Sequence, residues 1–238
     1  MRRRISLLVL SLLVILPVAA AAQSPPGPSL DGLAGGAKLD ALVGRVVASQ
    51  QALRSMRADF VQVKRSALLL EDARSSGEFS YRAPDSVRWD YRGPDRMVVL
   101  IADGTVTTYY PDQARAEQLK ISKKQRRFVR VLSGTQPLDD LTTDFTVTLV
   151  DAGGETPYLL KLQPVSALLK KRLSLVELKV DRRLFLPVAV EIREADGDST
   201  RYEFDHLVIN PDIDDSRFRL ELGADVRVVA IDASAGVG

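Results

Sequence analysis

Short runs in which apolar and polar residues alternate recur along the chain, and they are densest in residues 77–112. A period of two places alternate side chains on one face of a β-strand. The pattern therefore predicts four short strands within this segment. One face of these strands is expected to hold the side chains of Phe79, Tyr81, Val87, Trp89 and Tyr91.

Three dipeptides separate these strands and predict tight turns. Pro84-Asp85 and Gly93-Pro94 combine residues that suit turns for different reasons, because proline fixes φ and glycine accepts a positive φ. Asp103-Gly104 lies between two β-rich runs and predicts a hairpin, because both residues tolerate the positive φ of a type I′ turn.

The flanking segments predict a helix and further strands. Apolar residues recur near a helical period over residues 38–57, and the apolar face of this helix is expected to pack on the sheet. A first strand is predicted over residues 60–70, and a hairpin turn is predicted at Asp196-Gly197. The remaining strands of a meandering antiparallel sheet are expected at 145–150, 158–163, 173–180, 188–194 and 201–207.

A basic amphipathic helix is predicted over residues 122–133. Ser122 suits its N-cap, and Gly134 lies where a helix typically stops. Five cations occupy one side of this helix, which is the ordinary pattern of a solvated surface. Its other side carries Phe128, Val129 and Leu132.

The N-terminal residues 1–22 have the pattern of a secretory signal peptide. Three arginines precede an apolar run over residues 5–18, and small residues end at Ala22, so cleavage is expected before Gln23. The alternative is an uncleaved membrane anchor, although the run is shorter than the roughly 20 residues that span a bilayer. Residues 23–37 predict a flexible linker, and 38–238 are expected to form a single domain.

The charge balance changes once the signal peptide is set aside. The chain has 33 Lys and Arg against 31 Asp and Glu, and three of those arginines precede Gln23, which leaves 30 against 31. A basic surface for nucleic acid is therefore not expected.

Several classes of chemistry lack the residues they need. The chain has no Cys and a single histidine, His206. This composition argues against thiol catalysis and the usual zinc sites. His206 itself is interpreted as a rim residue. Asp212, Asp214 and Asp215 lack the glycine and distal glutamate of an EF-hand loop and are interpreted as a solvated loop. No enzymatic activity, metal or cofactor is expected, while paired carboxylates of a hydrolase stay open because any two acids can converge in a fold.

An ordered set of short motifs runs along the chain: Phe60-Val61-Gln62, Gly77, Pro84, Arg88-Trp89, Pro94, residues 98–101, Asp103-Gly104 and Tyr110-Pro111. Together with weaker likeness from about residue 38 to about residue 230, this set resembles the outer-membrane lipoprotein carrier (LolA-like) family. The resemblance implies an α+β domain, whose curved antiparallel sheet of about ten or eleven strands forms an incomplete half-barrel. Helices would cover its concave apolar face.

The function implied by this resemblance is that of a monomeric periplasmic carrier. It would bind the acyl chains of a lipoprotein, or another lipid, and carry them from the inner towards the outer membrane. An inner-membrane release complex and an outer-membrane acceptor would be its partners. Two alternatives stay open: an envelope sensor of lipids or lipoproteins with the same fold, and a lipid-modifying enzyme.

The resemblance also bears on the site. The aromatic and branched side chains that share one face of the predicted strands form either a filled core or the lining of a lipid cavity. The resemblance to the family favours the cavity. The helix at 122–133 would be its lid, closed through Phe128, Val129 and Leu132. The family commonly has an Arg that holds the lid at the position of Ala83, which leaves the lid lock of this chain open. The implied lining is Phe79, Tyr81, Val87, Trp89, Tyr91, Val99 and Ile101.

Overall fold

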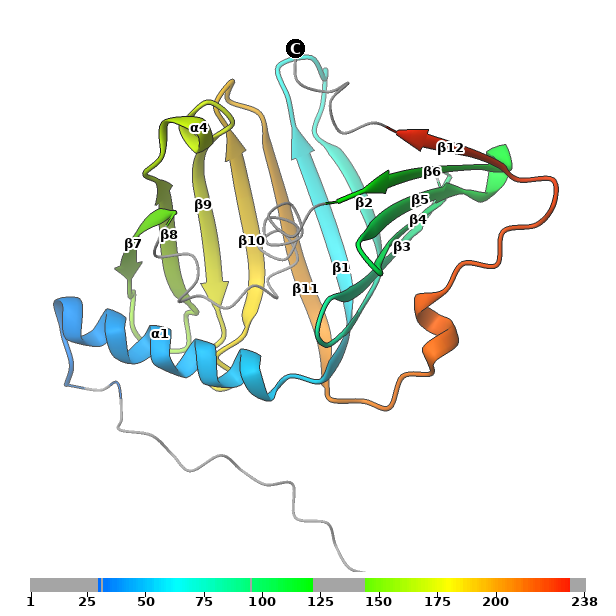
Figure 1. Cartoon of the computed structure of the whole chain (residues 1–238). Helices are drawn as coiled ribbons and strands as arrows, with labels where there is room; N and C mark the ends of the chain where they lie inside the picture. The colour runs from blue at the N-terminus through cyan, green and yellow to red at the C-terminus, as the bar shows by residue number, and fades with distance from the viewer. Residues whose placement is uncertain (1–29, 31, 95, 122–143, 232–238) are drawn as a thin grey trace, which may run out of the picture.

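A single sheet of twelve strands forms the body of the computed structural model, which describes residues 30, 32–94, 96–121 and 144–231 (Figure 1). The strand order is β12-β6-β5-β4-β3-β2-β1-β11-β10-β9-β8-β7. Neighbouring strands are antiparallel, except that β12 pairs with β6 in parallel. The first half comprises α1 (Gly35–Ala52), β1 (Ser55–Arg65), β2 (Ala73–Arg82), β3 (Ser86–Arg92), β4 (Met97–Ala102), β5 (Thr105–Tyr110), the 3-10 turn η1 (Pro111–Gln113) and β6 (Arg115–Lys120). The second comprises β7 (Phe145–Val150), β8 (Tyr158–Pro164), α4 (Ala167–Lys170), β9 (Leu173–Val180), β10 (Pro187–Glu194), β11 (Ser199–Ile209), the 3-10 turn η2 (Asp215–Phe218) and β12 (Arg227–Ile231).

Most of the predicted strands are confirmed. Residues 77–112 contain parts of β2 and the whole of β3, β4 and β5, and the later predictions match β7 to β11 within two residues. Asp103 and Gly104 have φ angles of 51° and 73°, the positive values that a type I′ hairpin needs. The alternating pattern therefore predicted the strands correctly where the two faces of a strand differ in polarity.

The boundary between the first helix and the first strand was predicted wrongly. The helix ends at Ala52 instead of residue 57, and β1 begins at Ser55 instead of residue 60. Asn210 fixes this change of structure, because its side-chain oxygen accepts hydrogen bonds from the backbone N–H groups of Arg54 (2.7 Å) and Ser55 (3.2 Å). Its amide nitrogen also donates to the carbonyl oxygen of Ala52 at 3.2 Å, so a residue more than 150 positions away ends the helix.

The edge formed by β6 and β12 was missed. The sequence of β6, RAEQLK, is charged and has low strand propensity, so no local signal marks it. It pairs with β5 after the 3-10 turn η1, and β12 then adds to it in parallel from Arg227↔Arg115 to Ile231↔Leu119. The sheet thus exceeds the expected ten or eleven strands. The fold is mostly β, with α1 as the one helix longer than a single turn in the described part of the chain.

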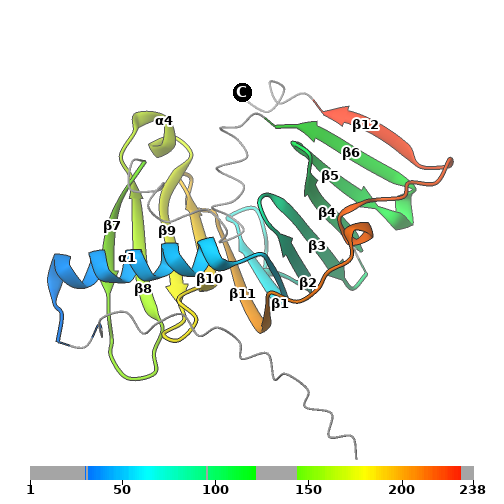
Figure 2. The ribbon, with the colours of Figure 1, turned by 60° about the horizontal axis from the view of Figure 1, so that its bottom comes forward.

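Ring contacts between distant strands show that the sheet curls. Trp89 of β3 lies 5.0 Å from Tyr202 and 5.7 Å from Phe204 of β11, measured between ring centroids. Two strands, β2 and β1, separate β3 from β11, which in a flat sheet means about 14 Å at about 4.8 Å per strand. The sheet therefore bends towards the face that carries these rings, and Figure 2 shows its two arms meeting near β1.

Gly77 allows the close packing at this bend. It lies opposite Phe60 in the ladder between β1 and β2. A Cβ atom at Gly77 would lie 1.9 Å from the carbonyl oxygen of Asp90 and 2.7 Å from Cε1 of Phe60. Phe60 occupies the space that a side chain would need, and its ring lies 4.8 Å from that of Trp89 in an edge-to-face arrangement.

Helix α1 runs across the ends of β7 to β10 (Figures 1 and 2). Leu42 and Val46, four residues apart on one side of the helix, are buried in the same core as the rings of the bend. Asp151, which follows β7, accepts a hydrogen bond from Lys38 of α1 at 2.6 Å and pairs with Arg182 of the β9–β10 turn. These contacts hold the pKa of the Asp151 carboxyl well below its usual range, with the hydrogen bond from Lys38 as the largest cause.

Substitution of Gly77 by alanine is expected to destabilise the fold by about 1–3 kcal/mol, because the new methyl group overlaps backbone and ring atoms. Gly44→Ala is the matched control, since Gly44 lies within α1 and a Cβ there meets no atom within 4 Å. This control is expected to stabilise by about 0.5–1 kcal/mol. Urea unfolding of both variants measures the difference, and equal effects would contradict the packing argument.

Asp151→Asn is expected to lower the free energy of unfolding at pH 7 by about 1–2 kcal/mol, through loss of charge-assisted hydrogen bonds. Because the folded pKa of Asp151 is depressed, its contribution is present above the unfolded pKa of about 3.9 and is lost as the pH falls through the folded value. The difference in stability between wild type and variant should therefore begin to shrink below about pH 4, and it should be smaller at pH 3 than at pH 7. Asp112→Asn, which removes an exposed pair with Arg96, should have a smaller effect, and urea unfolding at pH 7 and pH 3 tests both.

Candidate functional site

Six rings meet on the inner side of the bend and form what we term the aromatic cluster. Each ring lies between 4.7 and 5.7 Å from a neighbour, mostly in edge-to-face or tilted geometry. Such pairs stabilise by about 0.5–1.5 kcal/mol beyond the area they bury. The members come from four adjacent strands, β1, β2, β3 and β11, and are Phe60, Phe79, Trp89, Tyr91, Tyr202 and Phe204.

Two members of the cluster, Tyr91 and Tyr202, carry hydroxyl groups. Burial is the largest cause of a raised pKa for both phenols. Both phenols therefore stay neutral across the physiological range. A neutral surface with two hydroxyl groups can contact apolar chains and offers no nucleophile or general base.

All seven side chains expected in the lining share the inner face, and alternation predicted this for the five that lie between residues 79 and 91. Phe79, Trp89 and Val99 are direct cross-strand partners in one row, and Tyr81, Val87 and Ile101 form the next row. Tyr91 and Val99 are half-buried, and the other five are buried. That these side chains line a lipid cavity stays a proposal.

Tyr202 and Phe204 were not predicted as residues of the site. They alternate within the predicted strand at 201–207, but nothing local indicates that this strand lies three places from Trp89 in the sheet. Phe60 was noted within a motif, while its position over Gly77 follows only from the pairing of β1 with β2. The missing signal in each case is the long-range strand order.

The predicted lid residues Phe128, Val129 and Leu132 lie outside the described residues. Ala83 is exposed, and its N–H donates to the carbonyl oxygen of Arg54 at 2.8 Å. Arg82 pairs with Asp215 and lies over the ring of Phe218 on the other face of the sheet. Because Arg82 lies on the face opposite the predicted lining, it does not replace the arginine that the family commonly has at the position of Ala83.

The outer face of the same strands is charged and is crossed by η2, which lies outside the bend in both views (Figures 1 and 2). Arg217 of η2 contacts Glu78 at 2.5 Å and Asp90 at 2.7 Å. Arg88 donates to both carboxylate oxygens of Asp90 and to the carbonyl oxygen of Arg217. The sheet therefore separates an apolar inner face from a hydrogen-bonded outer face.

The other candidates from the sequence have ordinary structural roles. His206 is exposed, with its Nδ1 atom 3.1 Å from Asp59. Asp214 caps η2 by accepting from the N–H of Ser216, and Asp215 pairs with Arg82. Among the described residues, no group of three or more His, Asp or Glu side chains is placed to hold a metal ion. None of the helices in the described segments is long and apolar enough to cross a membrane.

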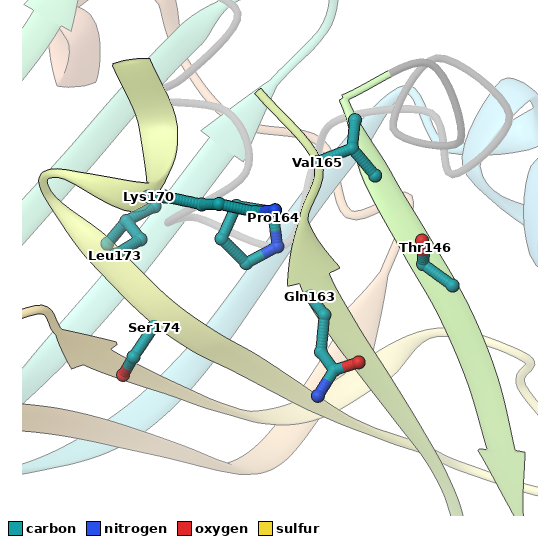
Figure 3. A pocket seen from close by; sticks show the side chains of 7 residues that line it. All are labelled: Thr146, Gln163, Pro164, Val165, Lys170, Leu173 and Ser174. Carbon is teal, nitrogen blue, oxygen red and sulfur yellow. The ribbon is translucent and has the colours of Figure 1, made fainter. Parts of the chain in front are cut away.

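Two pockets lie away from the aromatic cluster. One, of about 480 Å³, lies beside α4, where Lys170 extends towards Pro164 (Figure 3). The second, of about 340 Å³, is lined by residues that include Arg54, Arg82 and Asp212. Neither contains a residue of the predicted lining. The first is lined by Thr146, Gln163, Pro164, Val165, Lys170, Leu173 and Ser174.

A curled sheet with an apolar inner face and a helix across one end defines a fold class that solved structures share. The structure of MucB is similar, with a TM-score of 0.51 and 17% sequence identity over 82% of this chain and 66% of that chain. This likeness concerns the fold alone.

Sequence comparisons identify the family. The outer-membrane lipoprotein carrier protein of Halorhodospira halophila is 29% identical over 164 residues, covering 68% of this chain and 73% of that protein. The protein of the same name from Methylococcus capsulatus is 29% identical over 178 residues, covering 74% and 81%. The family model described as "Outer membrane lipoprotein carrier protein LolA" matches residues 51–221. The chain belongs to this family, as its motifs indicated.

Proposed function

We propose that the chain is a periplasmic carrier that shields the acyl chains of a lipoprotein, or of another lipid, on the inner face of its sheet. Cargo would pass from a release complex in the inner membrane to an acceptor in the outer membrane. The observation that carries this proposal is the apolar inner face with its aromatic cluster, on strands whose outer face is charged. Family membership supports the same assignment.

Physical chemistry requires such a shield for this kind of cargo. Removing one CH₂ group from water gains about 0.8 kcal/mol, so a chain of about sixteen carbons gains about 12 kcal/mol. An acyl chain therefore does not leave a bilayer for water at a useful rate, and a carrier must offer it an apolar surface. The inner face of β1 to β4 offers aromatic and branched side chains in adjacent rows.

In this proposal, cargo replaces the ring contacts that close the bend. Trp89 contacts Tyr202 and Phe204 across the two arms of the sheet, so an acyl chain entering between the arms separates these rings. The exchange of ring–ring for ring–acyl contacts keeps the apolar surface covered throughout. The hydroxyl groups of Tyr91 and Tyr202 are then polar atoms of the cluster that could donate to an ester or amide of the cargo.

Trp89 provides a direct test, since it is the only tryptophan of the chain. Titration with dibromostearic acid is expected to quench its fluorescence in the wild type. Val99, the cross-strand partner of Trp89 on the inner face, is replaced by glutamine, and the adjacent outer-face residue Val98 is the control. Both valines are half-buried in the same strand.

Val99→Gln is expected to weaken binding about tenfold, because a polar group in an apolar site costs roughly 1–3 kcal/mol. Val98→Gln should bind like the wild type. Absence of quenching at saturating ligand, or equal effects of the two variants, would rule out the inner face as the site. Mass spectrometry of lipids that co-purify with the exported protein separates the roles, because intact lipid indicates carriage and released products indicate an enzyme.

A further inference from the structure

Three consecutive leucines form the exposed end of the β1–β2 hairpin, and we term them the leucine tip. Leu68 is 94% exposed, Leu69 is 42% exposed and Leu70 is 105% exposed. Figure 1 shows this hairpin, in cyan, reaching beyond the neighbouring strands at the end of the sheet opposite α1. Single exposed leucines are ordinary on soluble proteins, whereas a contiguous exposed run at a projecting end indicates an interaction site.

The leucines are not needed to shape the turn. The N–H of Leu69 donates to the carbonyl oxygen of Ser66 at 3.0 Å, and the N–H of Ala67 donates to Asp198 at 3.3 Å. Arg65 and Asp72 pair at 2.8 Å across the base of the turn. These polar contacts would form equally well with polar side chains at positions 68–70. The fold therefore leaves the identity of the leucines unexplained.

Charged residues flank the base of the leucine tip, in the β1–β2 hairpin itself and in the turns beside it. The β10–β11 turn is held beside the hairpin by Asp198, and the N–H of Ala195 in that turn donates to the carbonyl oxygen of Arg172. The cations in these segments are Lys64, Arg65, Arg74, Lys170, Lys171 and Arg172. The acids are Glu71, Asp72, Glu194, Asp196 and Asp198.

The six cations outnumber the five acids by one, and three of the acids have partners within these segments. Asp72 pairs with Arg65, and Asp196 and Asp198 accept backbone N–H groups. Arg65 and Arg74 lie three and four residues from the nearest leucine, at most about 10–13 Å along a strand at about 3.3 Å per residue. Side chains of interfacial segments enter the boundary of a bilayer by about 5–10 Å, which would bring these cations to the level of the lipid phosphates.

We propose that the leucine tip inserts into the surface of an anionic phospholipid bilayer and docks this end of the molecule on the membrane. A bilayer accepts a projecting apolar tip without a matching shape, whereas a protein partner must offer a pocket. The two pockets described above are lined partly by Lys170 or by Arg54 and Arg82, so neither suits the tip of a second copy. The proposal deepens the carrier function, but binding of a membrane by the tip does not require cargo.

Vesicle flotation with the full-length mature chain tests the proposal. Vesicles contain phosphatidylcholine alone, or with one quarter phosphatidylglycerol. The wild type is expected to bind the anionic vesicles more strongly, and a Leu68→Ser/Leu70→Ser variant is expected to bind them at least about tenfold more weakly. Leu184→Ser is the matched control, because Leu184 is a 40% exposed leucine in the β9–β10 turn. It should bind like the wild type.

A probe attached at the tip gives an independent readout, because the chain has no native cysteine. Leu70→Cys labelled with the fluorophore NBD should brighten and shift to the blue on anionic vesicles, and labelled Leu184→Cys should not. No vesicle binding, or no change at the tip probe, overturns the proposal. So does self-association that depends on the tip, which would identify a second copy as the occupant.

The tip variant separates this inference from the carrier proposal. Leu68→Ser/Leu70→Ser should keep the full quenching of Trp89 by dibromostearic acid while losing vesicle binding. A wild type that binds the fatty acid and ignores vesicles overturns the tip proposal and leaves the carrier intact. A wild type that binds vesicles without quenching overturns the carrier site and leaves the tip.

Discussion

The contact between Trp89 and the two rings of β11 is the constraint on which the rest of the structure depends. It joins strands that a flat sheet would hold about 14 Å apart, and so it fixes the bend. The bend requires the β2 and β3 backbones to approach each other closely, which Gly77 permits because a Cβ there would overlap the Asp90 carbonyl. Once the sheet is bent, its two faces differ in character: one is enclosed by both arms, and the other is open to η2 and solvent.

The outer face keeps the bend in place from the opposite side. The guanidinium of Arg217 lies between Glu78 of β2 and Asp90 of β3, and Arg88 returns a hydrogen bond to the backbone of η2. Through these contacts the segment after β11 is held against β2 and β3 before it reaches β12 at the sheet edge. Because these charges are partly buried and mutually bonded, removing one member leaves its partners uncompensated. The polar network and the aromatic cluster therefore act on the same two strands, one from each face.

The local pattern of apolar and polar residues predicted most strands of the sheet. It predicted few of the long-range contacts that bend the sheet and end its helix. Alternation placed Phe79, Val87 and Trp89 on one face, and the Asp103-Gly104 turn followed from the φ values that these residues tolerate. The end of α1 depends on Asn210, and the approach of Tyr202 to Trp89 depends on strand order, so neither is encoded within a local window. The strand β6 forms because β5 offers it an edge, against its own low propensity.

The two apolar surfaces of this chain have opposite relations to water. Four rings of the aromatic cluster are buried, and in the proposed function cargo would take the place of their contacts with one another. The leucine tip is left in water, which is unfavourable for the free protein and would be relieved by a contact that covers it. If that contact is the bilayer surface, the cations behind the tip set its depth, and the docked end is the one opposite α1. Cargo would then enter or leave between the arms while the molecule rests on the membrane, so that no acyl chain has to cross open water.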